Sequence, residues 1–151
     1  MLPGSETSVR GLLEKDLAAI HELSLVELSV RRTIDETRSC IFGQNQVVRV
    51  LVDHGAHCIG YALGWQVRDI AELTEIAIAA PSKGRGFGRL LCTNFLSQVK
   101  QAGAKSIDLE VKDNNRIAIG LYESMGFLKV GVRAKYYRDG CDAWLYSLEV
   151  S

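Results

Sequence analysis

The sequence has no excess of charge of either sign and no long apolar run. Its 18 basic residues balance its 18 acidic residues, so the chain lacks the overall field with which proteins hold nucleic acid or an anionic membrane. No apolar stretch approaches the roughly 20 residues of a membrane-spanning helix. The first six residues lack the basic and apolar regions of a signal peptide. These absences predict a cytoplasmic protein with neither a nucleic-acid nor a membrane partner.

The sequence also lacks closely spaced metal ligands. Its four cysteines are scattered with no Cys-x-x-Cys pair, and its three histidines form no metal-spaced set. Zinc sites and thioredoxin-type redox sites need such spacing, so both are disfavoured. We expect free thiols in a reducing compartment and no metal. The residues concerned are Cys40, Cys58, Cys92, Cys141, His21, His54 and His57.

The length and the hydrophobic pattern predict one α/β domain spanning residues 1–151. A chain of 151 residues with 47% hydrophobic residues can fill one core, and it contains no repeat or linker-like stretch. Alternating and helical periodicities predict seven strands and several helices in a mixed sheet. The expected strands are 8–12, 46–52, 57–67, 70–80, 106–111, 127–136 and 141–150, and the expected helices lie within 14–37, 87–102 and 116–124.

A glycine-rich turn joins one of these strands to the next helix and has the sequence Lys83-Gly84-Arg85-Gly86-Phe87-Gly88. Such a turn leaves backbone N–H groups unpaired at the positive end of the helix dipole, where they can hold a phosphate. The P-loop pattern fails because Arg89-Leu90 follows Gly88, and the dinucleotide pattern fails because Arg89 replaces its third glycine. The alternative is a turn that only connects strand to helix.

A second segment lies downstream of the glycine turn. It contains Leu109-Glu110-Val111, Asn115, Ala118, Leu121-Tyr122 and Gly126-Phe127. Together with the glycine turn, this segment resembles the paired signatures of the GNAT acetyltransferases. The resemblance implies the GNAT fold, a mostly antiparallel mixed sheet of seven strands flanked by about four helices. It also implies acetyl-CoA as cosubstrate.

The resemblance assigns the cosubstrate to three parts of the chain. The backbone amides of residues 84–89 would hold the pyrophosphate, and the strand edge at residues 76–78 would pair with the pantetheine arm. Asn115 occupies the family position whose side chain binds that arm. The expected residues are therefore Ile76, Ala77, Ile78, Gly84, Arg85, Gly86, Phe87, Gly88, Arg89 and Asn115.

Direct attack of a neutral amine on a thioester needs a base, an oxyanion donor and an acid for the departing thiolate. Tyr122 is the expected acid, since a phenol with a pKa of about 10 is protonated at neutral pH. Glu110 alternates away from the apolar face of its strand and is the expected base, acting through water. Glu72 and Glu75 on the neighbouring strand remain alternative bases, and the backbone N–H of Ile78 is the expected oxyanion donor.

Within the superfamily, the chain is most similar to the protein amino-terminal acetyltransferases, especially the ribosomal-protein alanine (RimI-like) branch. Tyr136 and Tyr137 resemble residues that line the peptide groove there, which implies a protein or peptide amino terminus, such as that of a ribosomal protein, as acceptor. The segment Ser24-Leu25-Val26-Glu27 lacks the aromatic element usual between the first helices. A small-molecule amine as acceptor and a catalytically silent acetyl-CoA-binding module remain the alternatives.

Overall fold

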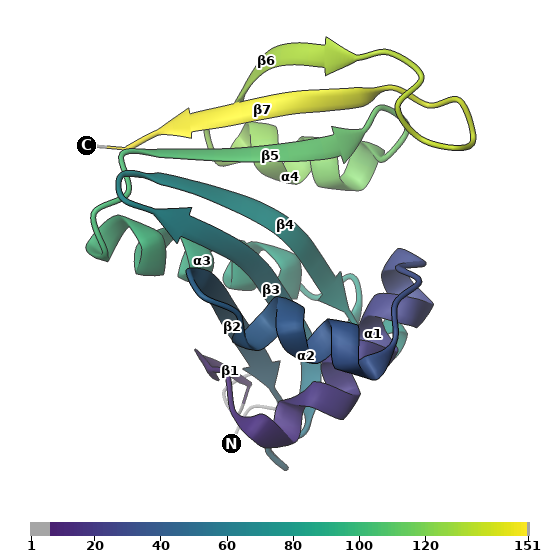
Figure 1. Cartoon of the computed structure of the whole chain (residues 1–151), viewed down its shortest axis with the longest axis vertical. Coiled ribbons are helices and arrows are strands. Elements are labelled where there is room, and N and C mark those ends of the chain that lie inside the picture. Colours follow the sequence, from purple (N-terminus) through teal and green to yellow (C-terminus); the bar gives the residue numbers. More distant parts are fainter. Residues whose placement is uncertain (1–6, 151) are drawn as a thin grey trace.

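A computed structural model describes residues 7–150 as a single sheet with helices on both faces (Figure 1). Residues 1–6, where no signal-peptide pattern is found, and residue 151 lie outside the described part. No helix within residues 7–150 is long and apolar enough to cross a membrane. The elements are β1 (Ser8–Gly11), α1 (Leu17–Leu28), α2 (Ile34–Phe42), β2 (Gln46–Val52), β3 (Cys58–Val67), β4 (Ile70–Ile78), α3 (Phe87–Gln101), β5 (Ser106–Lys112), α4 (Arg116–Ser124), β6 (Leu128–Arg133) and β7 (Ala143–Glu149).

The seven strands lie in the order β1-β2-β3-β4-β5-β7-β6. Every neighbouring pair is antiparallel except β4 and β5, which are parallel. The expected fold class, a mostly antiparallel mixed sheet of seven strands with four α-helices, is therefore confirmed.

The predicted elements are all present, and their ends differ where the backbone turns. The strand predicted over 127–136 ends at Arg133, because Lys135 adopts a left-handed conformation with φ +50°. The strand predicted over 70–80 ends at Ile78, because a 3₁₀ turn containing Pro81 follows. The helical region breaks at Ser29, which has φ +54° and ends α1.

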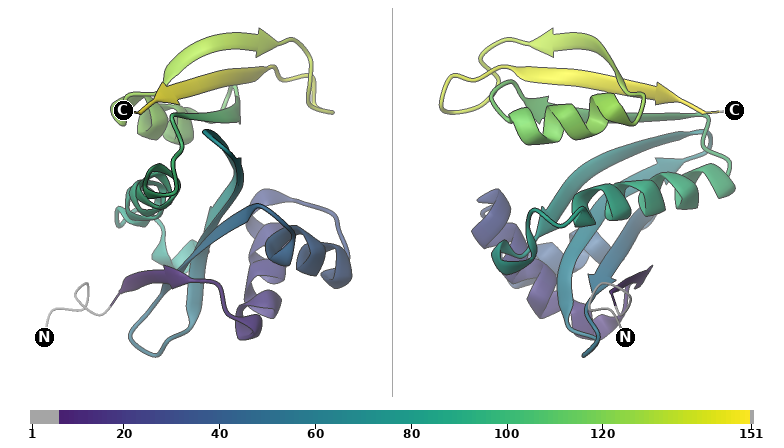
Figure 2. Two further views of the ribbon diagram at one scale, coloured as in Figure 1. Left: turned by 60° about the vertical axis from the view of Figure 1, so that its left-hand side comes forward. Right: turned by 180° about the vertical axis from the view of Figure 1, so that it is seen from behind.

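Two hydrophobic cores lie on the two faces of the sheet. One face packs on α3 and α4, and the stripe of Leu91, Phe95 and Val99 on α3 is fully buried there. The other face packs on α1 and α2, but this core draws only on β2, β3 and β4. Figure 2 shows the helix pairs on opposite sides and no helix over the β5-β7-β6 part of the second face. This open part is called the open face below.

The parallel pair of β4 and β5 is short. Its register runs from Ile70 opposite Ser106 to Leu73 opposite Leu109 and then stops. Beyond this point β4 continues beside β3, and β5 continues beside β7. The two strands diverge in Figure 1, so the sheet is split over the remaining length of both.

A β-bulge marks the beginning of this split. Leu63 on β3 is opposite Glu75, whereas Gly64 is opposite Leu73, so Thr74 is the extra residue on β4. A bulge shifts the alternation of side chains by one residue. Glu72 before the bulge and Glu75 after it consequently lie on the same face of the sheet.

The structure predicts that Gly64 tolerates no side chain at the bulge. A Cβ atom at Gly64 would lie 2.0 Å from the carbonyl oxygen of Glu72 and 2.5 Å from Cζ of Phe95. We expect Gly64→Ala to lower the free energy of unfolding by at least about 2 kcal/mol, because backbone and core must both move. Urea denaturation followed by circular dichroism measures the change.

Gly120→Ala in α4 is the matched control, because a Cβ atom there meets no described heavy atom within 4 Å. Alanine is favoured over glycine inside a helix by about 0.8–1.0 kcal/mol, so this variant should be slightly more stable than the parent chain. Equal stability changes in the two variants would contradict the close packing at Gly64.

Candidate active site

The glycine-rich turn presents unpaired backbone N–H groups at the beginning of α3. Gly84 and Gly86 have φ angles of +76° and +83°, which favour glycine. Gly86 is the N-cap and supplies no side-chain hydrogen bond, and the first helical bond runs from the N–H of Leu90 to the carbonyl of Gly86. Among the described residues, no hydrogen-bond partner occurs for the backbone N–H groups of residues 84–89. The turn can therefore bind an anionic group through its backbone.

The basic side chains of this turn point in different directions. Arg85 lies over the ring of Phe87, with its guanidinium carbon 5.1 Å from the ring centroid. Arg89 donates a 2.6 Å hydrogen bond to Ser124 and so links α3 to α4. Lys83 forms an ion pair with Glu27 on α1, which connects the turn to the opposite face of the sheet.

The end of β4 has a free edge beside the turn. Residues 76–78 pair with residues 60–62 of β3 on one side, and their pairing with β5 has already ended on the other. Asn115 lies across the split at the beginning of α4, where its side-chain oxygen accepts a 3.2 Å hydrogen bond from the N–H of Ala118. This capping bond leaves the side-chain NH₂ group of Asn115 available to a ligand.

Tyr122 lies on the α3–α4 side of the split. Its ring packs edge-to-face on Phe127, with centroids 5.8 Å apart, and only 5% of the residue is exposed. Burial raises the pKa of its hydroxyl, so the phenol is protonated throughout the neutral range. Within the described chain, this hydroxyl makes no hydrogen bond to another protein group. Tyr122 is thus a protonated donor without a protein acceptor.

Glu110 lies on the opposite side of the sheet from Tyr122. Leu109 and Val111, its neighbours on β5, are buried in the α3–α4 core, so the side chain of Glu110 points to the open face. Its carboxylate forms a 3.0 Å ion pair with Arg133 at the end of β6. A pocket of about 340 Å³ lies on this face and is lined by Glu72, Glu110 and Arg133 among others.

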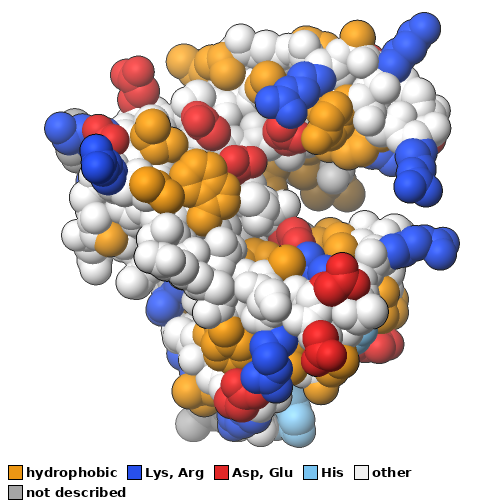
Figure 3. Space-filling view, in the orientation of Figure 1, with side chains coloured by type: hydrophobic (Ala, Val, Ile, Leu, Met, Phe, Trp, Pro, Cys, Tyr) orange, Lys and Arg blue, Asp and Glu red, His pale blue; other side chains and the backbone are white. Residues whose placement is uncertain are grey.

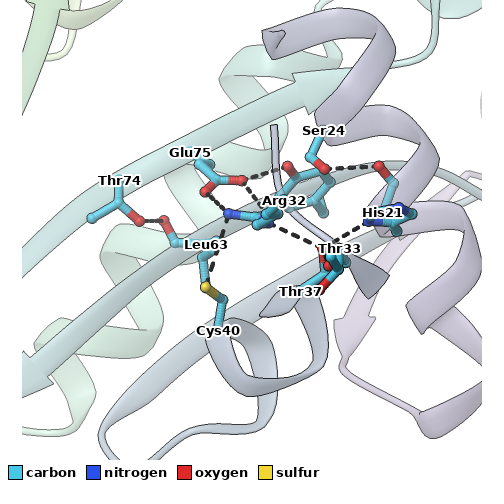
Figure 4. Close-up of polar contacts among 10 residues, drawn as sticks. His21, Ser24, Arg32, Thr33, Thr37, Cys40, Leu63, Thr74 and Glu75 are labelled. Carbon is cyan, nitrogen blue, oxygen red and sulfur yellow. Dashed lines mark hydrogen bonds and ion pairs between the residues drawn. The ribbon is translucent and has the colours of Figure 1, made fainter. Parts of the chain in front are cut away.

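The two alternative bases differ in their surroundings. Glu72 lines the pocket, and its pKa is raised by burial and by the negative charge of Glu110, which favours a neutral carboxyl. Glu75 instead forms an ion pair with Arg32 and accepts a hydrogen bond from Tyr61 (Figure 4). Glu75 is therefore held by strong donors, whereas Glu72 and Glu110 face the pocket.

The tyrosine pair follows β6, where the chain leaves the sheet. The rings of Tyr136 and Tyr137 pack edge-to-face with centroids 5.3 Å apart, and Tyr136 is 52% exposed. Arg133 lies near the Tyr136 ring, and Lys112 near the Tyr137 ring. The left-handed Lys135 turns the strand, so both tyrosines lie in an irregular segment beside Arg133 and Glu110.

The predicted residues consequently gather around one opening in the sheet. Figure 3 shows a notch between the two halves of the molecule, with basic side chains on both rims. The glycine turn and Tyr122 belong to one face, and Glu110 and the tyrosine pair belong to the other. Sequence reasoning missed Arg32 and Arg133, because an isolated arginine has no local signal of its partner. It also missed the pairing of Glu27 with Lys83.

The family model for the acetyltransferase (GNAT) family matches residues 15–127. A Bacillus subtilis protein that is named as a ribosomal protein bS18-alanine N-acetyltransferase is 27% identical to this chain over 135 residues. The match covers 89% of each chain. The Escherichia coli ribosomal protein bS18-alanine N-acetyltransferase is 33% identical over 116 residues, covering 73% of this chain and 78% of that one.

Solved structures show the same fold. The crystal structure of the ribosomal-protein-S18-alanine N-acetyltransferase from Escherichia coli has a TM-score of 0.87 at 28% identity, covering 96% of this chain and 94% of that chain. A chain of the NatC complex bound to Gag peptide and CoA has a TM-score of 0.86 at 22% identity, covering 97% and 99%. This second likeness concerns the fold alone.

Cys92 is adjacent to the glycine turn in the sequence, and its thiol is wholly buried on α3. Burial raises its pKa to about 12, so roughly one thiol in 10⁴ is ionised at pH 8. We expect an alkylating reagent at pH 8 to leave Cys92 unmodified in the native protein while it modifies Cys141, on the loop before β7. Peptide mass spectrometry after quenching measures both sites.

Unfolding in guanidinium chloride provides the control, because all four thiols should then react at similar rates. Native Cys92 that reacts as fast as native Cys141 would instead support a nucleophilic cysteine near the site.

Proposed function

The chain belongs to the acetyltransferase (GNAT) family, and we propose that it transfers an acetyl group from acetyl-CoA directly to the α-amino group at a protein amino terminus, such as that of a ribosomal protein. The proposal treats residues 1–151 as one N-acetyltransferase domain. A ribosomal-protein acceptor agrees with the cytoplasmic location expected from the sequence. One observation carries the proposal: a carboxylate and a protonated tyrosine lie on opposite faces of the same opening in the sheet.

The cosubstrate enters this proposal on the α3–α4 face. The unpaired N–H groups of residues 84–89 would bind the pyrophosphate, and the positive end of the α3 dipole would favour its charge. The free edge of β4 at residues 76–78 would pair with the amides of the pantetheine arm. Asn115 would donate its side-chain NH₂ group to the same arm. The thioester would then lie in the split, beside the backbone N–H of Ile78.

Glu110 is the proposed base. Its position on the open face allows it to accept the proton that the attacking amine loses, through an intervening water. Oε1 of Glu110 lies 3.0 Å from Nη1 of Arg133, and the Glu110 side chain remains 27% exposed. The carboxylate can thus remain bound to Arg133 and still accept a hydrogen bond from water. Glu75 is disfavoured as the base because its carboxylate already accepts bonds from Arg32 and Tyr61.

Tyr122 is the proposed acid. The amine forms a bond to the carbonyl carbon, the carbon–sulfur bond breaks, and the hydroxyl of Tyr122 gives its proton to the departing thiolate. The raised pKa supports this role, because the phenol is protonated when the thiolate forms. No acetyl group passes through a cysteine in this sequence of steps, which agrees with the burial of Cys92.

An α-amino group is the proposed acceptor for a chemical reason and a structural one. Its reference pKa of about 7.7–8.0 leaves an appreciable neutral fraction at pH 7, whereas lysine, at about 10.4, is almost wholly charged. Tyr136 and Tyr137 lie in the irregular segment beside Glu110, where they could line a groove for an extended peptide. The bS18-alanine N-acetyltransferases among the relatives favour the same acceptor class.

A paired-peptide assay tests the acceptor. One peptide begins with a free alanine and contains no lysine, and the other has the same sequence with a blocked amino terminus and an internal lysine. Release of free CoA is followed for both, with a polyamine as a third acceptor and with peptides that vary the first residue. We expect acetylation of the free amino terminus to be fastest. Faster reaction of the blocked peptide or of the polyamine would overturn the proposed acceptor.

Tyr122→Phe should lower turnover by a factor on the order of 10², because the thiolate would leave without a proton donor. Affinity for acetyl-CoA, measured by calorimetry, should remain nearly unchanged. Tyr146→Phe is the matched control: Tyr146 is also buried in this core, but its hydroxyl donates to Glu123. Similar turnover in the two variants would indicate that Tyr122 only packs in the core and donates no proton.

Glu110→Gln should lower turnover by a factor on the order of 10² near pH 7 and by less near pH 9, where most of the α-amine is already neutral. The pH dependence of turnover at saturating acetyl-CoA measures this difference. Glu72→Gln and Glu75→Gln are the comparison variants. If either of them has this pH signature and Glu110→Gln lacks it, the base is assigned wrongly.

A further inference from the structure

Arg32, a largely buried arginine, links the connection between α1 and α2 to the part of β4 that lies beyond its pairing with β5. Arg32 lies in this connection, residues 29–33, and forms a two-pronged ion pair with Glu75 (Figure 4). Its Nη1 is 2.7 Å from Oε2 of Glu75, and its Nη2 is 3.0 Å from Oε1. The two side chains are only 10% and 14% exposed, so the pair is largely shielded from water.

Other donors and acceptors complete the geometry of this pair. The hydroxyl of the buried Tyr61 donates a 2.7 Å bond to Glu75, so the carboxylate accepts three hydrogen bonds. The Nε of Arg32 donates a 3.1 Å bond to the hydroxyl of Thr37 on α2, which is also 2.8 Å from Nδ1 of His21 on α1. A planar guanidinium bound at both ends has very little freedom to reorient. The pair therefore joins α1, α2, β3 and β4 in one arrangement.

The ion pair between Arg32 and Glu75 lies at the opening in the sheet. Glu75 follows the bulge at Thr74, beyond the last pair between β4 and β5. The bulge turns Glu75 toward α1 and α2, where Arg32 meets it. Figure 1 shows α1 and α2 on one side of the split and the loop after β6, which carries Tyr136 and Tyr137, on the other. The α1–α2 pair with its connection and the tyrosine segment thus lie on opposite sides of the split.

A buried ion pair is a poor source of net stability, because desolvation of both charges offsets their attraction. What a two-pronged pair does supply is a fixed direction and distance between the elements it joins. In this chain it fixes a connection whose backbone–backbone hydrogen bonds, among the described residues, lie only at its two ends: the N–H groups of Ser29 and Val30 donate to Ser24, and the N–H of Thr37 donates to Thr33. The arrangement therefore suits control of the position of that connection.

We infer that Arg32 is a positioning residue for the acceptor, acting through Glu75 to hold the α1–α2 connection at the mouth of the split. The inference rests on the proposed function, since it assigns the acceptor to that mouth. Arg32 has no part in the chemical step. Its loss should weaken acceptor binding and leave the affinity for acetyl-CoA unchanged. The fixed connection is thus a determinant of acceptor recognition.

The test compares Arg32→Met with Arg31→Met, which removes a neighbouring, exposed arginine from the same connection. For Arg32→Met we expect the KM of the alanine peptide to rise about tenfold or more, with kcat within about threefold and the acetyl-CoA Kd within about twofold. Arg31→Met should resemble the parent chain. Arg32→Lys should lie between them, because an ammonium reaches the carboxylate without the fork and cannot bind Thr37 at the same time.

Hydrogen exchange provides a readout that does not depend on the acceptor. The hydrogen-bonded backbone amides of Val30 and Thr33, which donate to Ser24 and Glu36, should exchange faster in Arg32→Met than in Arg31→Met, and the amides of residues 84–89 should not change. If removal of one charge prevents folding, the double variant Arg32→Met/Glu75→Gln removes both and leaves an acceptor for Tyr61. The same rise in acceptor KM is expected there.

An acceptor KM that is unchanged in Arg32→Met, or raised equally in Arg31→Met, would overturn the inference. A loss of kcat with unchanged KM would overturn it as well, by placing the pair in the chemical step. A parent chain that acetylates no peptide amino terminus would refute the proposed function instead. In that case, two measurements decide the role of Arg32: the hydrogen-exchange rates and the KM of the acceptor that reacts fastest among the peptides and the polyamine.

Discussion

The arrangement of this molecule depends on the point where β4 and β5 stop pairing. Four residue pairs join the two strands, from Ile70 with Ser106 to Leu73 with Leu109. After that, each strand keeps a partner on its other side, so the sheet is split without being lost. Backbone groups on the inner edges of the split are left for a ligand to bind. Nearly every residue assigned to the site lies along these two edges or at their ends.

The split also allows chemistry to operate from both faces of one sheet. A continuous sheet would separate Glu110 from Tyr122, because Glu110 belongs to the open face and Tyr122 to the α3–α4 core. In the proposed mechanism, the amine approaches the thioester carbon through the split from one face, and the sulfur receives a proton from the other face.

The polar groups around the split divide into those that have protein partners and those that do not. Arg32 and Glu75 bind each other and fix the α1–α2 connection. The hydroxyl of Tyr122 and the N–H groups of residues 84–89 have no partner within the described chain, although forming such bonds is normally favourable. The groups with protein partners define the shape of the site. The groups without partners are those to which a bound substrate would supply hydrogen-bond partners.

The sequence by itself determined the order and type of the elements, the turn at residues 84–88 and the candidate pair of Glu110 and Tyr122. Local periodicity, glycine positions and the two motifs carry that information, because each depends on residues close together in the chain. The strand ends did not follow from the same patterns. The left-handed Lys135, which comes just after β6, has no sequence signal comparable to that of a glycine. The pairing order of the strands could not be derived from local patterns alone.

Only the tertiary structure decided how the carboxylates differ. Glu72, Glu75 and Glu110 look alike in the strand patterns of the sequence. Their surroundings differ because the bulge at Thr74 shifts the face of β4 and Arg32 then pairs with Glu75 across 43 positions of sequence. Bulges and long-range ion pairs depend on what packs against a residue, and a single sequence does not list those neighbours. The surroundings of these carboxylates and the pairing of Glu75 with Arg32 are therefore properties of the folded chain.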